Sequence, residues 1–342
     1  MLARVKRKKF LQITSVLFLL LIVSGYMSLT YGEFSMKVSE VLQTLFLLDG
    51  TRDHSIVIFS FRLPRIIIGL FVGLGLGVAG AIIQALTRND LADPGILGIN
   101  AGAGLAIVVY MFIVSKLEVG TELLSTFTLP IFGWIGGMGA ALFIYGFSWN
   151  NGKLDSSRLL LVGIALGSGL GAITLYISLK MDPQDFEAAT MWMTGSIANA
   201  NWNQIMSIVP WFVVILPFIF IRASHLDLFY LGEDTAKNVG LSTEWEKSIW
   251  LLASIGLISA CVSVSGSIGF VGLLSPHIAR RLIGLHHKMV TVVSGMIGMV
   301  LVTVSDFIAK SVFSPVELPV GVVVSIVGIP YFIYLLRRKA NK

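Results

Sequence analysis

Charged residues are scarce in this 342-residue chain: Asp, Glu, Lys and Arg make up 13% of it, whereas 55% of it is hydrophobic. A soluble globular domain carries about 25% charged residues, so this chain has too few to cover a surface in contact with water. Its charges also lie between apolar runs of about 20 residues, the length of helix that crosses a hydrocarbon core about 30 Å thick. The composition therefore excludes a soluble domain and predicts an all-α polytopic membrane protein.

Cysteine and the usual patterns of cofactor sites are also rare. The single cysteine, Cys261, excludes an intramolecular disulfide, and it is expected to be a small buried hydrophobe inside an apolar run. The five histidines are scattered without metal-ligand spacing, so no metal site is predicted. No G-x-x-x-x-G-K-[ST] sequence occurs, and the G-x-G-x-x-G match at 75–80 lies inside an apolar run. We expect no catalytic residues and no cofactor on this chain; ATP and Mg²⁺, if used, belong to another polypeptide.

Ten apolar segments are candidate membrane spans. They lie near residues 11–31, 62–86, 95–115, 127–147, 158–179, 206–222, 247–265, 268–276, 289–308 and 319–336. The eighth is too short to cross a membrane unless its neighbours shield it, and Pro276 is expected to end it.

Basic residues are concentrated in the two tails. A ten-span topology puts 18 of the 25 Lys and Arg residues on the cytoplasmic side and 7 outside, as the positive-inside tendency requires. Both termini are therefore predicted to be cytoplasmic, with the first span as an uncleaved anchor. The net charge of +6 is attributed to flanks beside anionic lipid, and no nucleic-acid partner is expected.

Small residues recur at every fourth position in two of the spans. Gly69, Gly73, Gly77 and Ala81 share one face of the second span, and 163–171 repeats the pattern in the fifth. Such faces let helix backbones approach closely in lipid, so they predict tight helix packing.

Acidic residues are almost missing from the predicted spans, where Asp306 is the only acid well inside a helix. Ion-coupled carriers generally need several carboxylates at membrane depth, so a stand-alone secondary transporter is the weaker alternative function. For Asp306 itself, a helix-end contact with Lys310, four residues further on, is favoured over a proton relay.

Two arginines flank a proline at the predicted outer end of the second span. Arg62 and Arg65 are placed there against the positive-inside tendency. Two interpretations remain open: the side chains extend toward lipid phosphates, or they pair bidentately with carboxylates of an acidic partner.

Three segments on the predicted cytoplasmic side carry polar or exposed residues. The break at 88–95, with Asn89 and Leu91, indicates a turn followed by a new helix. Ser156 and Ser157 begin the fifth span, where small hydroxyls favour helix N-caps. The apolar residues of the loop 222–247, among them Leu226 and Phe229, predict two short amphipathic helices that dock on a partner protein or lie on lipid headgroups.

Together these segments resemble the FecCD family, the permease subunits of ATP-driven importers for iron-siderophores, haem and cobalamin. The resemblance is carried by RLPR (62–65), the break at 88–95, WMTGS (192–196), the L-G-E-x-x-A-x-x-x-G run (231–240), GFVGLLSPHIARR (269–281) and ELPVGVVVSIVGIPYFIYLL (317–336). It implies the type II ABC importer permease fold, in one transmembrane domain over 1–342 with a cytoplasmic coupling loop at 222–247.

The resemblance also implies roles for single residues. An extracytoplasmic substrate-binding protein would dock on Arg62, Arg65 and Lys310. The cytoplasmic gate would be formed by Asn89, Leu91, Ser156 and Ser157. The ATPase would be contacted by Leu231, Gly232, Glu233, Ala236 and Gly240. Two positions depart from the family pattern: Asp90 stands in place of a proline, and Lys310 stands where an arginine is frequent and lacks its fork geometry.

The function implied by the resemblance is import of a metal chelate, above all a ferric siderophore, across the cytoplasmic membrane of a bacterium. The partners implied are a second permease subunit, identical or related, two ABC ATPase subunits and the binding protein. Covalent chemistry would take place on the ATPases, so this chain is not expected to be an enzyme.

Overall fold

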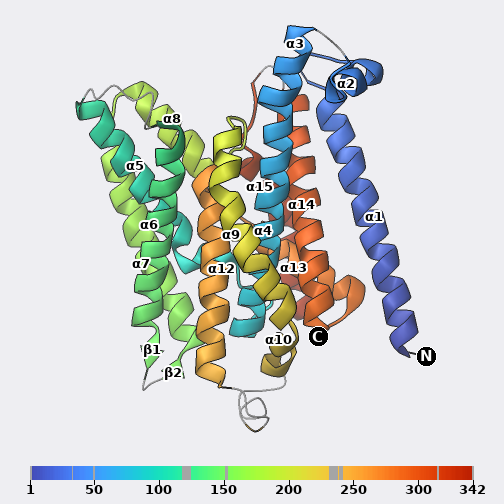
Figure 1. The fold of residues 1–342 in the computed structure, drawn as a ribbon. Helices are drawn as coiled ribbons and strands as arrows, with labels where there is room; N and C mark the ends of the chain where they lie inside the picture. Colours follow the sequence, from blue (N-terminus) through green and yellow to red (C-terminus); the bar gives the residue numbers. More distant parts are fainter. Residues whose placement is uncertain are drawn as a thin grey trace.

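The apolar runs of the sequence form long helices (Figure 1). The computed structural model describes residues 2–32, 34–48, 51–117, 125–150, 153–230, 238, 242–313 and 316–340. Its long helices are α1 (Leu2–Thr30), α4 (Leu63–Thr87), α5 (Ile99–Leu117), α6 (Ser125–Phe147), α7 (Ser156–Ser178), α9 (Trp202–Arg222), α12 (Thr243–Ser265), α14 (His287–Ser311) and α15 (Val320–Ala340).

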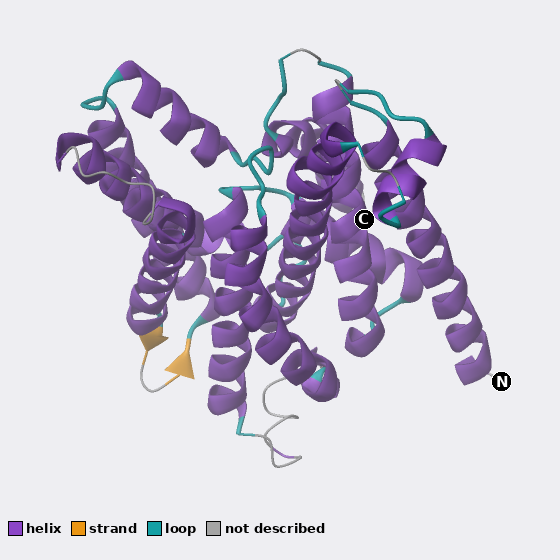
Figure 2. Ribbon diagram, turned by 45° about the horizontal axis from the view of Figure 1, so that its top comes forward, coloured by secondary structure: helices purple, strands orange, loops and turns teal. Residues whose placement is uncertain are grey.

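Shorter elements connect these helices. They are α2 (Val38–Leu45), α3 (Arg52–Ser55), the π-helix η1 (Ile56–Arg62), the 3-10 helix η2 (Pro94–Leu97), β1 (Trp149–Asn150), β2 (Lys153–Leu154), α8 (Pro183–Thr194), α10 (Ser224–Tyr230) and α13 (Val271–Ile283). The two strands pair antiparallel, with Trp149 opposite Leu154. Figure 2 shows how little of the described chain is strand.

Eight of the described helices are long and apolar enough to cross a membrane by length and composition. Each of the ten predicted spans overlaps a helix. Two of these helices are not among the eight: α13, which overlaps the eighth predicted span, and α15, whose apolar stretch Val320–Tyr334 is shorter. The prediction of an all-α polytopic membrane protein is therefore confirmed.

Two predicted helix boundaries are wrong. Helical structure is continuous over Arg52–Thr87, so it begins ten residues before the predicted start of the second span and includes η1. Pro276 lies inside α13 and does not end it. Proline removes the hydrogen bond to the carbonyl four residues earlier and crowds that carbonyl, but packing of α13 on α4 and α14 keeps the helix continuous beyond it.

The centre of the bundle is formed by α4, α12 and α14, whereas α1 and α7 are mostly exposed. The predicted small-residue face of α4 packs here. A Cβ atom on Gly73 would lie 2.4 Å from the carbonyl oxygen of Gly298, and one on Gly77 would lie 2.4 Å from that of Ser294. Only glycine permits this approach of α4 to α14, so the packing interpretation is confirmed for the second span.

Non-helical backbone interrupts the bundle at 195–201 and 266–270. Gly266 adopts a φ of +66° at the end of α12, which favours glycine. The two breaks satisfy each other's backbone groups, because the N–H of Ser196 donates to the carbonyl of Ser265 at 2.8 Å. Gly321 N–H likewise donates to the Gly195 carbonyl at 3.0 Å. Irregular backbone at membrane depth is stable only with such internal partners.

The bundle has two ends, which we name after the predicted topology. The outer end carries α2, α3 and α8, and the inner end carries α10 and the β1–β2 hairpin (Figure 1). Both chain termini lie toward the inner end (Figure 1).

Candidate functional site

The three predicted docking residues lie together at the outer end. Arg62, Arg65 and Lys310 line one cavity of about 380 Å³, although the chain separates Lys310 from the arginines by more than 240 residues. The other lining residues are Tyr31, Gly32, Phe34, Val57, Phe61, Ala198, Asn199 and Glu317. The cavity thus combines three cationic side chains with aromatic walls and one carboxylate.

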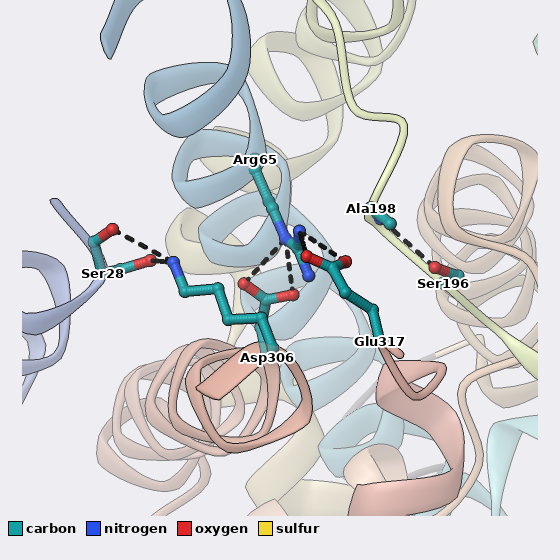
Figure 3. A network of polar contacts seen from close by, with 7 residues as sticks. Ser28, Arg65, Ser196, Ala198, Asp306 and Glu317 are labelled. Carbon is teal, nitrogen blue, oxygen red and sulfur yellow. Dashed lines mark hydrogen bonds and ion pairs between the residues drawn. The ribbon is translucent and has the colours of Figure 1, made fainter. Parts of the chain in front are cut away.

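Arg65 is held by two carboxylates of this chain (Figure 3). Its Nε lies 2.9 and 3.1 Å from the two carboxylate oxygens of Asp306. Its Nη1 lies 3.1 and 2.9 Å from those of Glu317. The side chain of Asp306 is 4% exposed and that of Glu317 is 37% exposed. Asp306 is therefore a buried partner of Arg65, and Glu317 is a partner open to solvent.

Arg62 and Lys310 cap the outer end of α1. The buried guanidinium of Arg62 donates to the carbonyls of Leu29 and Phe34. Lys310 Nζ donates to the carbonyl of Ser28 at 3.0 Å and to its hydroxyl at 2.6 Å. The last carbonyls of a helix lack intrahelical partners and carry partial negative charge, so cations are favoured there. Asp306 and Lys310 each bond to these other partners and form no direct hydrogen bond with one another, although their opposite charges still interact.

The predicted gate turn at the inner end of α4 is folded by its own side chains. Asn89 Oδ1 accepts a hydrogen bond from the N–H of Leu91 at 3.0 Å, which closes an Asx turn. Asp93 then accepts hydrogen bonds from the N–H groups of Gly95 (3.1 Å) and Phe270 (3.3 Å). Burial raises the pKa of Asp93 more than these two bonds lower it. The turn is thereby attached to the start of α13.

Asp90 has a partner of its own at this turn. Its Oδ1 lies 3.3 Å from Nη2 of Arg280, which also donates to Oε1 of the buried Gln84. Gln84 Nε2 in turn donates to the carbonyls of Ala92 (3.1 Å) and Leu273 (3.2 Å). An ion pair to α13 therefore stands where a proline was expected.

The other predicted gate turn begins α7. Asp155, not a serine, is the N-cap: its Oδ1 accepts from the N–H groups of Ser157 (2.8 Å) and Arg158 (3.1 Å). The N-cap interpretation of Ser156 and Ser157 is therefore wrong, and both are first-turn residues of α7. Since η2 packs against α7, the two turns belong to neighbouring elements.

The predicted coupling residues Leu231, Gly232, Glu233, Ala236 and Gly240 lie outside the described residues. The preceding helix, α10, is described. Leu226 and Phe229 were expected to contribute to an exposed docking face, but they are buried in the core of this chain, 0% and 2% exposed. That part of the prediction is wrong, because α10 packs against α4 and α14.

Comparison with known proteins decides the family. The model of the FecCD transport family matches residues 20–338. The chain belongs to the FecCD transport family. It is a multi-pass membrane permease subunit, as the sequence motifs predicted.

Curated relatives and a solved structure agree with the assignment of this chain to the FecCD family. It is 48% identical to the iron-uptake system permease protein FeuC of Bacillus subtilis over 320 residues, 94% of this chain and 95% of the relative. It is 44% identical to the iron(3+)-hydroxamate import system permease protein FhuG of the same organism, over 99% of this chain and 100% of the relative. A solved metal-chelate type ABC transporter in an inward-facing conformation matches with a TM-score of 0.83 and 26% identity, covering 96% of this chain and 99% of that one.

Several polar contacts of this FecCD permease were not predicted from its sequence. They are the pair of Arg65 with Glu317, the contacts of Gln84 with Arg280, and the contact of Asp227 with His287. Gln84 carried a usable signal, because it is a strongly polar side chain inside an apolar run. Glu317 lies in the connection before α15 and Asp227 on the short helix α10, and the neighbouring sequence does not indicate a partner for either carboxylate.

Proposed function

We propose that this chain is the membrane-spanning subunit of a bacterial ABC importer that translocates a metal chelate, most specifically a ferric siderophore, across the cytoplasmic membrane. The observation that carries the proposal is the near full-length similarity to permeases named for iron uptake and ferric hydroxamate import. Both termini are cytoplasmic in this proposal, in keeping with the basic tails.

In this assembly the chain binds no nucleotide, cofactor or metal of its own. Two ABC ATPase subunits hold ATP and Mg²⁺ and contact the loop around Gly232, and their closure moves the inner ends of the helices. The proposed division of labour is supported by the lack of a Walker-type phosphate-binding sequence in this chain. The permease itself performs no covalent step and has no catalytic residue.

A second permease subunit, identical or related, completes the pathway. The support comes from α7, whose large apolar side chains are exposed, among them Leu161 (68%) and Tyr176 (61%). Gly171 has no neighbour within 4 Å of an added Cβ, so this end of the small-residue face of α7 is open, whereas Gly163 and Gly167 pack against the backbone of Gly98 in this chain. A close approach of two α7 helices or of a bulky chelate would use this face.

An extracytoplasmic binding protein delivers the chelate to the cavity of Arg62, Arg65 and Lys310. The excess of cationic side chains in its lining favours a partner that presents carboxylates. At the opposite end, Asn89, Leu91, Ser156 and Ser157 border the cytoplasmic exit. The turn of Asn89 and Leu91 is attached to α13 through Asp93, so a shift of α13 is expected to change that exit.

The test is uptake of a radiolabelled ferric siderophore by proteoliposomes that contain the permease, its co-purifying ATPase and the binding protein. We expect uptake that requires ATP and survives a protonophore. Uptake driven by a proton gradient without ATP would instead establish the secondary transporter. Asp306, the acid on which a proton relay would depend, is occupied by Arg65, which supports the importer.

Coupling is tested separately by Gly232→Pro, which is expected to release the ATPase from the detergent-solubilised complex. Gly269→Ala is the matched control, because a Cβ there would meet nothing within 4 Å. A Gly232→Pro complex that retains its ATPase and transports normally would contradict the proposed contact.

A further inference from the structure

The two carboxylates that hold Arg65 differ in how firmly they are fixed. Asp306 lies on α14 and is almost completely buried. Glu317 lies in the non-helical connection 316–319 before α15, and more than a third of its side chain is exposed. Breaking the contact to Glu317 requires only movement of a side chain into solvent, whereas losing Asp306 would leave a buried charge without its partner.

Glu317 occupies the open side of the guanidinium. Figure 3 shows Arg65 between Asp306 and Glu317, and Glu317 is the carboxylate that lines the outer cavity. A partner carboxylate that entered this cavity to pair with Arg65 would therefore meet Glu317 first. Glu317 already holds Nη1 of Arg65 through both of its oxygens, so a partner carboxylate that pairs with this side of the guanidinium competes for the same N–H groups and is repelled by the charge of Glu317.

We propose that Glu317 is an internal substitute for the partner's carboxylate, which holds Arg65 in the free permease and is displaced when the binding protein docks. The inference rests on the proposed function, in which an acidic binding protein docks at this cavity. Docking is then an exchange of one ion pair for another. The side chain of Arg65 is held in place both in the free permease and in the docked complex, so docking costs little side-chain conformational entropy at this residue.

This exchange makes Glu317 a residue that determines partner specificity. A protein surface without a correctly placed carboxylate gains nothing from Arg65, since it would have to break the Glu317 pair without replacing it. A surface with such a carboxylate recovers the full interaction. Because the Glu317 pair must be broken first, the affinity for the binding protein is lower than it would be if Arg65 had no internal partner on this side.

The exchange is tested with nanodisc-reconstituted complexes, titrated with the substrate-binding protein that supports uptake by the wild-type complex. Glu317→Gln keeps the size of the side chain but removes its charge, and we expect the Kd for the binding protein to fall about three- to tenfold. Glu187→Gln is the matched control: it removes an exposed carboxylate of α8 at the same end and is expected to change the Kd by less than about twofold.

Arg65→Lys separates failure of the exchange from failure of docking. It keeps a charge beside Asp306 and loses the fork geometry, so docking is expected to weaken. If Arg65→Lys weakens docking but Glu317→Gln leaves it unchanged or weaker, Glu317 is not displaced and the exchange is overturned. If Arg65→Lys docks with wild-type affinity, the binding protein does not dock through Arg65; the exchange then falls, whereas the importer function keeps its separate test of ATP-dependent uptake.

A fluorophore on Val316→Cys reports the displacement directly, because Val316 is exposed and adjoins Glu317. In the wild-type background we expect its emission to change when the binding protein is added. In the Glu317→Gln background the free permease should already show the shifted emission. An emission that does not respond in the wild-type background, while the binding protein binds, would overturn the exchange.

Discussion

The carboxylate of Asp227 lies 2.8 Å from Nδ1 of His287 and also accepts a hydrogen bond from the backbone N–H of His287 at 2.9 Å. The two residues are 60 positions apart, so this contact fixes α10, the helix that precedes the predicted coupling segment, to the first turn of α14. Since α14 packs along α4, the contact connects the inner end of the chain with its central helix.

Asp227→Ala is expected to lower stability by about 1–3 kcal/mol, because the buried His287 loses two hydrogen bonds to one acceptor. The midpoint of thermal unfolding in detergent should fall, and ATP-driven uptake should fall with it. His286→Ala is the control, since His286 is exposed and its Nδ1 lies 3.7 Å from the same carboxylate. An unchanged unfolding midpoint for Asp227→Ala would contradict the structural role.

Glycines on α4 and α7 are expected to respond differently to alanine. Gly73→Ala would put a Cβ 2.4 Å from the carbonyl oxygen of Gly298, so the helices must separate at a cost of about 1–3 kcal/mol. Gly171→Ala meets nothing within 4 Å and should leave the unfolding midpoint of the isolated chain unchanged. Loss of uptake by a stable Gly171→Ala protein would locate a second subunit or the substrate at this face, whereas equal midpoints for both variants would contradict the packing.

Charge reversal at Arg62 is expected to act on folding more than on docking. Arg62→Glu would place a buried carboxylate against the carbonyls of Leu29 and Phe34, a loss of more than about 2 kcal/mol. Membrane abundance, measured by immunoblot, should fall well below that of the wild type. Arg52→Glu, at an exposed position of α3, should leave abundance unchanged. Normal abundance of Arg62→Glu would show that the end of α1 does not depend on this cap.

The contacts of Arg280 predict an order of stabilities at the inner turn. Asp90→Asn removes an ion pair whose acidic member is half exposed, so it should cost less than about 1 kcal/mol. Arg280→Ala also leaves Oε1 of the buried Gln84 without this donor, at about 1–3 kcal/mol. Thermal unfolding should therefore rank Asp90→Asn close to the wild type and Arg280→Ala clearly below it; the reverse order would exclude this account of the turn.

The local patterns of the sequence were sufficient for the helices and for the position of the outer site. Apolar length identified the eight helices that are long enough to cross a membrane, and the four-residue spacing of Gly69, Gly73 and Gly77 identified the packing face of α4, because both properties belong to one helix. RLPR and Lys310 identified residues that do lie in one cavity, although that inference came from family resemblance and not from spacing.

Contacts between distant segments could not be predicted in this way. Arg65 and Glu317 are 252 residues apart, and no property of either segment indicates the other. The same holds for α10, where the apolar face of Leu226 and Phe229 was assigned to a partner because the sequence does not show that α4 and α14 cover it. Amphipathicity indicates that a face is covered, and only the tertiary structure shows by what.

The burial of Cys261 has a practical consequence for all of these experiments. Its side chain is fully buried, and its Sγ lies so close to α4 that a Cβ on Gly75 would approach it to 2.4 Å. Because the chain has no other cysteine, thiol-reactive reagents find no accessible target on the native protein. A cysteine introduced on the surface can therefore be labelled selectively in the wild-type background, without first building and validating a cysteine-free variant.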